Sequence, residues 1–221
     1  MTGFIDAFAH FIGASPSSFH AADQAARQLE TAGWSRGALE SGAISAERGF
    51  VVRDGAIVAW QQSAGVRPDA PYRIVGTHTD SPGFVVKPSP SFAASGYAEV
   101  GVEVYGGPIL ASWFDRELEL AGRLVTHDGS VHLVRSGPAL RIPHLAIHLD
   151  RDINAALKID TQRHVQPVWA AGDAGDIIAS LAEAAGVAAG EVAGWDLITV
   201  PTEAPARFGR SGELFASPRL D

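Results

Sequence analysis

One short motif in the sequence combines a metal-binding side chain with a carboxylate, His78-Thr79-Asp80. It follows the apolar run Tyr72–Gly76, which we expect to be a buried strand whose end is the usual place for a ligand site in an α/β sheet. Side chains at positions i and i+2 of an extended segment project to the same side, so His78 and Asp80 can face one pocket. The imidazole can then ligate a metal ion, while the carboxylate fixes its tautomer or tunes a metal-bound water. The same spacing also suits a buried histidine that Asp80 satisfies without any metal.

A second pair of histidines, His144 and His148, lies four positions apart. A zincin-type metal site requires a glutamate directly after the first histidine, and Leu145 occupies that position. The alternation of Leu145, Ile147 and Leu149 instead predicts a strand with both histidines on one face. Surface or interface histidines are the simplest interpretation of this pattern.

The run Trp113-Phe114-Asp115-Arg116 places a carboxylate and a guanidinium beside two large aromatic rings. Such a run is typical of a structural ion pair between arginine and a carboxylate, and less typical of a catalytic pair. No Gly-x-Ser-x-Gly elbow occurs in the sequence, which weakens a serine-hydrolase interpretation.

The composition narrows the class of protein. The 221 residues carry 17 Lys and Arg against 25 Asp and Glu, which gives a net charge of −8 with neutral histidines. This balance argues against a nucleic-acid-binding surface or a membrane anchor, because both need clustered positive charge. The absence of cysteine excludes disulfides, Cys-ligated zinc, iron–sulfur clusters and cysteine nucleophiles. With no signal-peptide pattern and no apolar run of membrane-spanning length, we expect a cytoplasmic globular protein.

Apolar periodicity predicts the elements that must position these residues. It indicates helices over residues 1–12 and 19–29, with a hydroxyl from Ser15–Ser18 as the N-cap of the second helix. The dipeptide Asp54-Gly55 predicts a β-hairpin between Phe50–Arg53 and Ala56–Trp60. From residue 91 to about 149 we find only short strands and turns, which indicates a mostly β module. The remaining expected elements are a strand Phe84–Lys87 ended by Pro88 and Pro90, strands Val100–Tyr105, Leu118–Val125, Val131–Arg135 and Trp195–Val200, and a helix Ala174–Ala185.

Several segments together resemble the aspartyl aminopeptidase family of dinuclear metallo-aminopeptidases. They occur in the family's order and cover nearly the whole chain, which corresponds to the N-terminal half of a family member. In chain order they are Ser15–Ala21, Gly76–Pro82, Val102–Gly107, Ser112–Leu118, Leu120–Arg123, Ile142–Leu149 and Ser217–Asp221.

The resemblance implies an α/β fold in which a catalytic α/β domain is interrupted by an inserted β-rich dimerisation domain. Residues 1–90 would be the first part of the catalytic domain, 91–208 the inserted domain, and 209–221 the start of the return to the catalytic domain. Family members assemble into large homo-oligomers built from dimers. The glutamate that acts as general base and the remaining metal ligands belong to the second half of the family's length and have no counterpart in these 221 residues.

The resemblance also implies roles for individual residues. His78 matches a metal ligand, and Asp80 matches the aspartate that orients it and assists catalysis. Asp221 matches the carboxylate that bridges the two metal ions, and His148 is similar to a histidine that reaches a neighbouring subunit's active site and helps to hold the substrate. Two divalent metal ions are implied, with zinc expected, although these ligand types also suit manganese or cobalt. The implied substrates are peptides that lose N-terminal, often acidic, residues.

Other interpretations of the same sequence stay open. The chain could be a truncated relative of the enzyme that is catalytically inert and serves as a self-association module through residues 91–208. It could also be a subunit that is completed by a separately encoded second half. In either case no nucleic acid or membrane is expected as a partner.

Overall fold

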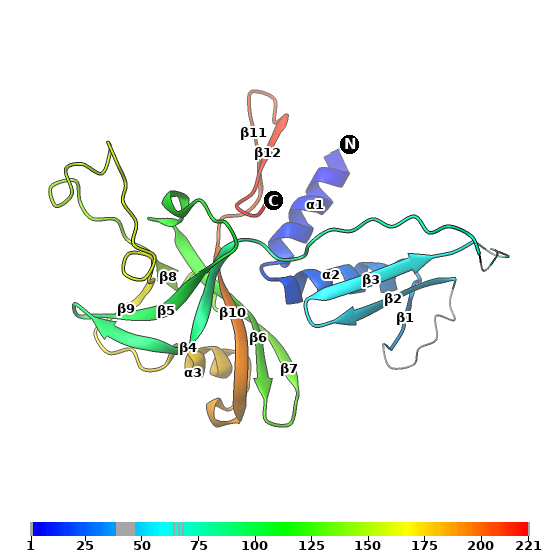
Figure 1. The fold of residues 1–221 in the computed structure, drawn as a ribbon, viewed down its shortest axis with the longest axis horizontal. Helices are drawn as coiled ribbons and strands as arrows, with labels where there is room; N and C mark the ends of the chain where they lie inside the picture. The colour runs from blue at the N-terminus through cyan, green and yellow to red at the C-terminus, as the bar shows by residue number, and fades with distance from the viewer. Residues whose placement is uncertain (1, 39–46, 64, 66, 68, 221) are drawn as a thin grey trace. The chain divides into compact units, whose positions relative to one another are not determined.

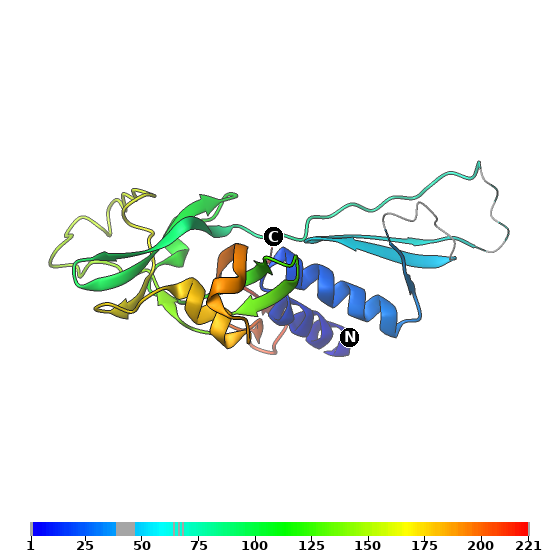
Figure 2. The same cartoon turned by 90° about the horizontal axis from the view of Figure 1, so that it is seen from below.

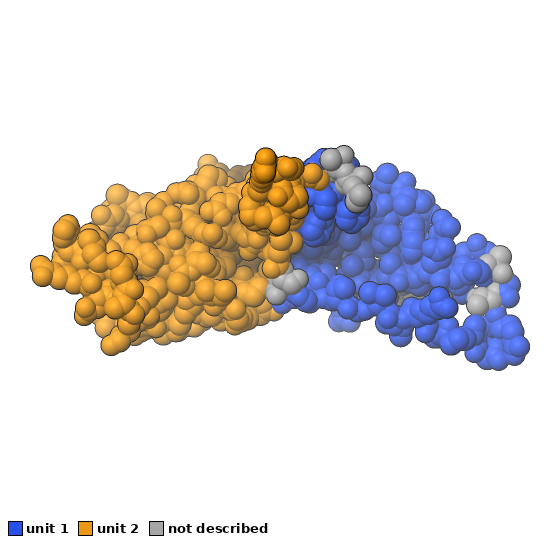
Figure 3. Space-filling view, turned by 90° about the horizontal axis from the view of Figure 1, so that it is seen from above, with its two compact units in different colours: residues 1–80 blue, residues 81–221 orange. Residues whose placement is uncertain are grey.

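The fold comes from a computed structural model that describes all residues except 1, 39–46, 64, 66, 68 and 221. The chain divides into two compact units, residues 1–80 and 81–221 (Figure 3). The division falls between Asp80 and Ser81. Strand β4 (Gly83–Ala94) crosses residue 90, after which the resemblance implies a domain boundary, and that boundary stays a prediction. None of the helices in the described residues is long and apolar enough to cross a membrane.

Residues 1–80 form two helices and a small sheet (Figures 1 and 2). Helix α2 begins after Ser17, whose hydroxyl accepts a hydrogen bond from the His20 N–H at 3.5 Å, so the predicted N-cap is confirmed. The predicted hairpin is also confirmed, with Asp54 in its turn at a φ of 54°. The elements are α1 (Thr2–Ala14), α2 (Ser18–Thr31), β1 (Ser35–Arg36), β2 (Arg48–Arg53) and β3 (Ala56–Gln61), with β1 parallel and β3 antiparallel to β2.

Residues 81–221 are rich in strands, as the pattern of short strands and turns predicts. That residues 91–208 are an inserted dimerisation domain stays a prediction. Besides β4, its elements are β5 (Tyr97–Tyr105), η2 (Leu110–Trp113), β6 (Glu117–Thr126), β7 (Val131–Arg135), β8 (Leu140–Arg141), β9 (Val168–Ala171), α3 (Ile177–Ala184), η3 (Ala189–Glu191), β10 (Val192–Pro201), β11 (Ala206–Phe208) and β12 (Leu214–Ala216).

The main sheet of this unit closes into a barrel. Its strands follow the order β10, β4, β5, β9, β8 and β6, and β6 pairs with β10 to complete the ring (Figure 1). The β6–β10 pairing is antiparallel and extends from Leu118 opposite Pro201 to Thr126 opposite Val192. Strand β7 pairs with β6 beside β8, and β11 and β12 form a separate hairpin. Closure satisfies backbone groups that would otherwise lie along open sheet edges.

Strand β4 extends beyond its predicted end. Pro88 and Pro90 were expected to end it, yet the strand continues to Ala94. The pairing with β5 is interrupted between Val86 and Ser91, so both prolines lie in an irregular stretch of the ladder. Proline is tolerated at such a bulge because no ladder hydrogen bond is needed from its nitrogen.

Apolar side chains from around the barrel form one core, to which α3 contributes its apolar face. Asp176 caps α3 by accepting the Ile178 N–H at 3.0 Å, and it also accepts the Ser91 hydroxyl at 3.0 Å. These bonds fix the start of α3 against β4. Core residues that are fully buried include Phe84, Val100, Val102, Leu118, Leu120, Leu124, Ile142 and Val165.

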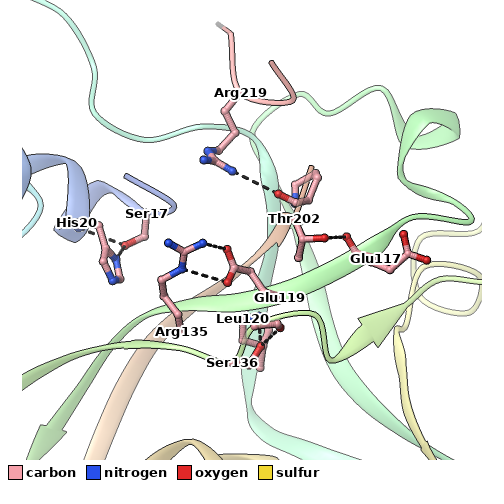
Figure 4. A network of polar contacts seen from close by, with 11 residues as sticks. Ser17, His20, Glu117, Glu119, Leu120, Arg135, Ser136, Thr202 and Arg219 are labelled. Carbon is pink, nitrogen blue, oxygen red and sulfur yellow. Dashed lines mark hydrogen bonds and ion pairs between the residues drawn. The ribbon is translucent and has the colours of Figure 1, made fainter. Parts of the chain in front are cut away.

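Polar contacts at the beginning of β6 connect three strands (Figure 4). The Glu119 side chain is only 2% exposed, and its carboxylate accepts two hydrogen bonds from Arg135 on β7, at 2.6 and 3.1 Å. The Glu117 carbonyl oxygen accepts both the N–H and the hydroxyl of Thr202, each at 3.1 Å. Because a buried carboxylate without a partner is strongly destabilising, the Arg135 contact fixes the register of β7 on β6.

Strand β6 lies close to β10 at Gly122, and this contact supports a stability prediction. A Cβ at this position would lie 1.9 Å from the Asp196 carbonyl oxygen, and the φ of 156° is unusual for other residues. Gly122→Ala must therefore push the two strands apart. We expect the free energy of unfolding, measured by urea denaturation, to fall by about 3 kcal/mol.

Gly194→Ala is the matched control on β10. A Cβ at Gly194 would meet no described atom within 4 Å. We expect its effect to stay below about 1 kcal/mol. Equal losses for the two variants would contradict the close approach at Gly122.

Candidate functional site

The structure brings His78 and Asp80 together, as their spacing predicts. The His78 Nδ1 atom lies 3.3 Å from Oδ1 of Asp80 and 2.8 Å from the Asp80 carbonyl oxygen. A ring that donates from Nδ1 carries its lone pair on Nε2, which is the form in which histidine ligates a metal. The two side chains are 54% and 44% exposed, so His78 is not the buried histidine of the alternative interpretation.

The segment that precedes this pair is not the expected buried strand. Tyr72, Ile74 and Val75 are 89%, 87% and 91% exposed, and residues 72–76 pair with no strand in the described part of the chain. The prediction was wrong for this structure because an apolar run becomes a buried strand only where a neighbouring strand supplies hydrogen bonds and cover. The Thr79 hydroxyl instead donates to the Gly55 carbonyl oxygen at 2.6 Å, which ties the segment to the β2–β3 turn.

The segment around His148 also differs from its prediction. Residues 144–149 are not a strand, and the Leu149 N–H donates to the Ala146 carbonyl oxygen at 2.8 Å in a turn. His148 is exposed, and Leu145 and Leu149 are 61% and 75% exposed. The alternating pattern therefore gave the wrong element, and the two histidines do not lie on one face of a strand.

A contact that sequence reasoning missed joins His144 to Asp115, 29 positions earlier. Oδ1 of Asp115 accepts the His144 backbone N–H at 3.2 Å, and Oδ2 lies 3.0 Å from Nδ1 of the His144 ring. The same ring stacks on Phe114, with centroids 4.1 Å apart and an interplanar angle of 11°. Asp115 and Arg116 were expected to form an ion pair, but each pairs with another residue. The Arg116 Nη2 atom lies 3.5 Å from Oε2 of Glu203, and Oδ1 of Asp115 lies 3.7 Å from Nη2 of Arg141.

These contacts change the acidity of Asp115. Burial alone would raise its pKa, but the hydrogen bonds from His144 and the charges of His144 and Arg141 outweigh this and hold the pKa below its usual value. The carboxylate is thus stabilised in its ionised form.

Asp221, the expected bridging carboxylate, lies outside the described residues. Arg219 nearby is described, and its Nη1 donates to the Pro201 carbonyl oxygen at 3.4 Å (Figure 4). Burial lowers the pKa of Arg219, an effect that the negative charge of Glu119 opposes. The chain leading to Asp221 is therefore attached to the end of β10.

The side chains of the described residues do not by themselves fit a two-metal centre. In that part of the chain, no group of three or more His, Asp or Glu side chains gathers as metal ligands would. A cavity of about 390 Å³ lies elsewhere, lined by residues that include Thr126, His127, Asp128, His132 and Glu191. Hydrogen bonds from Thr126 and Ser130 lower the pKa of Asp128 to about 2, so this carboxylate is already engaged. None of the expected site residues lines this cavity.

The fold is that of the M18-type aminopeptidases. A crystal structure of an M18-family aminopeptidase from Thermotoga maritima has a TM-score of 0.74 at 21% identity, and the match covers 97% of this chain and 50% of that one. A chain in the cryo-EM structure of the Ape4 and Nbr1 complex has a TM-score of 0.86 at 29% identity, with 94% of this chain and 46% of that chain covered.

The chain belongs to the Aminopeptidase I zinc metalloprotease (M18) family, which matches residues 11–221. The probable M18 family aminopeptidase 2 of Streptomyces avermitilis is 50% identical over 226 residues, which cover 99% of this chain and 52% of that protein. Its counterpart in Mycobacterium leprae is 41% identical over 220 residues, covering 96% and 51%. The chain spans about half the length of the curated relatives it matches. The resemblance to dinuclear metallo-aminopeptidases is confirmed at the level of this zinc metalloprotease family.

The lowered pKa of Asp115 predicts how stability depends on pH. The unfolded carboxyl titrates near 3.9, so the unfolded state binds more protons than the folded state as pH falls. The stabilisation is present above that value and is lost as pH falls through the lower pKa of the folded state. Asp115→Asn should therefore reduce the free energy of unfolding at pH 7 and have a smaller effect at pH 3, measured by urea denaturation at both values.

Asp152→Asn serves as the control, because Asp152 is another exposed aspartate of the same unit. Its effect should be similar at the two pH values. A loss for Asp115→Asn that is equally large at pH 3 would show that the ionised carboxylate does not contribute.

Proposed function

We propose that this chain is the N-terminal half of a zinc metallo-aminopeptidase that removes N-terminal residues from peptides. The observation that carries the proposal is the M18 family match over residues 11–221, which includes the His78-Thr79-Asp80 motif. The identity of 50% to a probable M18 aminopeptidase over nearly the whole chain supports the same conclusion.

In this proposal His78 supplies one metal ligand, and Asp80 holds its ring in the orientation that ligation needs. The 3.3 Å distance between His78 Nδ1 and Asp80 Oδ1 supports this division of roles. Asp221 would bridge two divalent ions, expected to be zinc, and His148 would contact the substrate. The described side chains do not complete such a centre, so its other ligands must come from outside these residues.

Three finer points belong to the proposal. The substrates would be peptides with acidic N-terminal residues. The protein would be cytoplasmic. It would also form a homo-oligomer built from dimers, with residues 91–208 as the dimerisation domain.

A catalytically inert self-association module is the second candidate. The observation that favours it is that no three metal-ligating side chains lie together in the described part of the chain. The same observation argues against activity of residues 1–221 alone. The two candidates differ in what they need to become active. A half-enzyme gains activity when its second half is supplied, whereas an inert module does not.

The test uses residues 1–221 alone and a joined chain, in which they are followed by the C-terminal half of the Streptomyces avermitilis relative. We expect no turnover of Asp- and Glu-anilides by residues 1–221 and turnover by the joined chain, with bound metal measured in the same samples. In the joined chain, His78→Ala should lower kcat/KM by roughly a thousandfold, because this class of enzyme depends on its metal ligands.

His10→Ala is the matched control, since His10 is an exposed histidine in the same unit. It should leave kcat/KM within about twofold of the unchanged joined chain. Full activity of the His78→Ala variant would rule out the metal-ligand role. A folded, metal-loaded joined chain without turnover would sink the aminopeptidase proposal and leave the self-association module. Comparison with Leu- and Ala-anilides decides the preference for acidic residues.

A further inference from the structure

Asp115 is held firmly by the barrel at a position where the backbone is strained. Its φ is 57°, in the left-handed region that favours glycine. Its N–H donates to the Ile142 carbonyl oxygen at 2.9 Å, and Phe114 and Ile142 form an isolated parallel bridge. Phe114 and Ile142 are 9% and 0% exposed, so this junction is part of the core.

The Asp115 side chain uses this fixed position to hold His144. Its two oxygens face the backbone N–H and the ring Nδ1 of His144, at 3.2 and 3.0 Å. The backbone bond fixes where residue 144 lies, and the ring bond together with the stacking on Phe114 fixes the plane of the imidazole. The Nε2 atom of His144 is buried and has no hydrogen-bond partner among the described residues, so its polar contacts there are those to Asp115.

The five residues after His144 lack comparable support. Among the residues that the structure describes, the hydrogen bonds of residues 145–149 are those of their own turn, such as Leu149 N–H to Ala146 O at 2.8 Å. Leu145, Ile147 and Leu149 are 61%, 44% and 75% exposed. The direction in which this segment leaves the barrel is therefore set at His144.

We infer that Asp115 and His144 form an anchor that positions His148 for its contact with the substrate. The inference rests on the substrate role proposed for His148. Asp115 and His144 are positioning residues in this scheme, because they act through the 145–149 segment. A hydrogen bond to a charged carboxylate has the strength to hold a short exposed segment in one place.

The competing explanation is that Asp115 only forms the turn. Aspartate tolerates a positive φ better than most residues, so its side-chain bonds could be incidental. Glycine distinguishes the two explanations. Asp115→Gly suits the backbone at 57° and removes both bonds to His144, whereas Asp115→Asn tolerates the backbone and keeps one acceptor oxygen.

The first measurement is hydrogen–deuterium exchange of residues 142–150 in the 221-residue chain. We expect Asp115→Gly to speed exchange in this segment by roughly tenfold, the scale of one charge-assisted hydrogen bond, and Asp115→Asn to have an intermediate effect. Glu117→Gln is the control, because Glu117 is an exposed acid that shares Arg141 with Asp115 and has no bond to His144. Unchanged exchange in Asp115→Gly would overturn the anchor whatever the enzyme's function.

The second measurement is a double-mutant cycle in the joined chain. Asp115→Gly should lower kcat/KM by roughly tenfold, and its effect in the His148→Ala background should shrink to less than about twofold. Faster exchange with equal effects in both backgrounds would overturn the link to His148. If His148→Ala itself left kcat/KM unchanged, the proposed substrate role of His148 would fail, and the exchange result would still decide whether the anchor exists.

Discussion

The pairing of β6 with β10 is the constraint on which the unit 81–221 depends. It closes the barrel, and it requires glycine at position 122 because the Asp196 carbonyl oxygen occupies the space of a side chain. Two segments that the proposed site uses lie next to these strands. Asp115 lies just before the beginning of β6, and the chain that reaches Arg219 leaves from the end of β10. The Thr202 bonds to Glu117 join the two starting points, so the barrel fixes both segments together.

Elements determined by local pattern could be predicted from the sequence. The hairpin at Asp54-Gly55, the N-cap of α2 and the main strands of the barrel all follow from turn chemistry and periodicity. The two predicted strands that do not form, at 72–76 and 145–149, are apolar runs that find no strand to pair with in the described residues. Periodicity reports which side chains favour burial, but a strand also needs a neighbour, and the neighbour is not encoded in the run itself.

The same distinction applies to the candidate site. His78 and Asp80 are two positions apart, so their contact follows from the geometry of an extended chain and was predictable. Asp115 and His144 come from segments that the sequence marked separately, and their contact depends on the bridge between Phe114 and Ile142. Arg116 was the expected partner of Asp115 because it is adjacent, but adjacent residues need not point toward each other. The fold instead brought Arg141 and His144 to that carboxylate.

A metal centre that hydrolyses peptides needs several ligands held in one place, and such ligands come from distant parts of a chain. The described residues contain the His78–Asp80 pair, which the local geometry of the chain can form. They contain no group of three or more metal-ligating side chains, which only long-range packing can bring together. The anchor at His144 is different, because the barrel that builds it lies wholly within residues 81–221. Its hydrogen bonds are formed within the described residues. The proposed anchor can therefore form without the ligands that would complete the proposed metal centre.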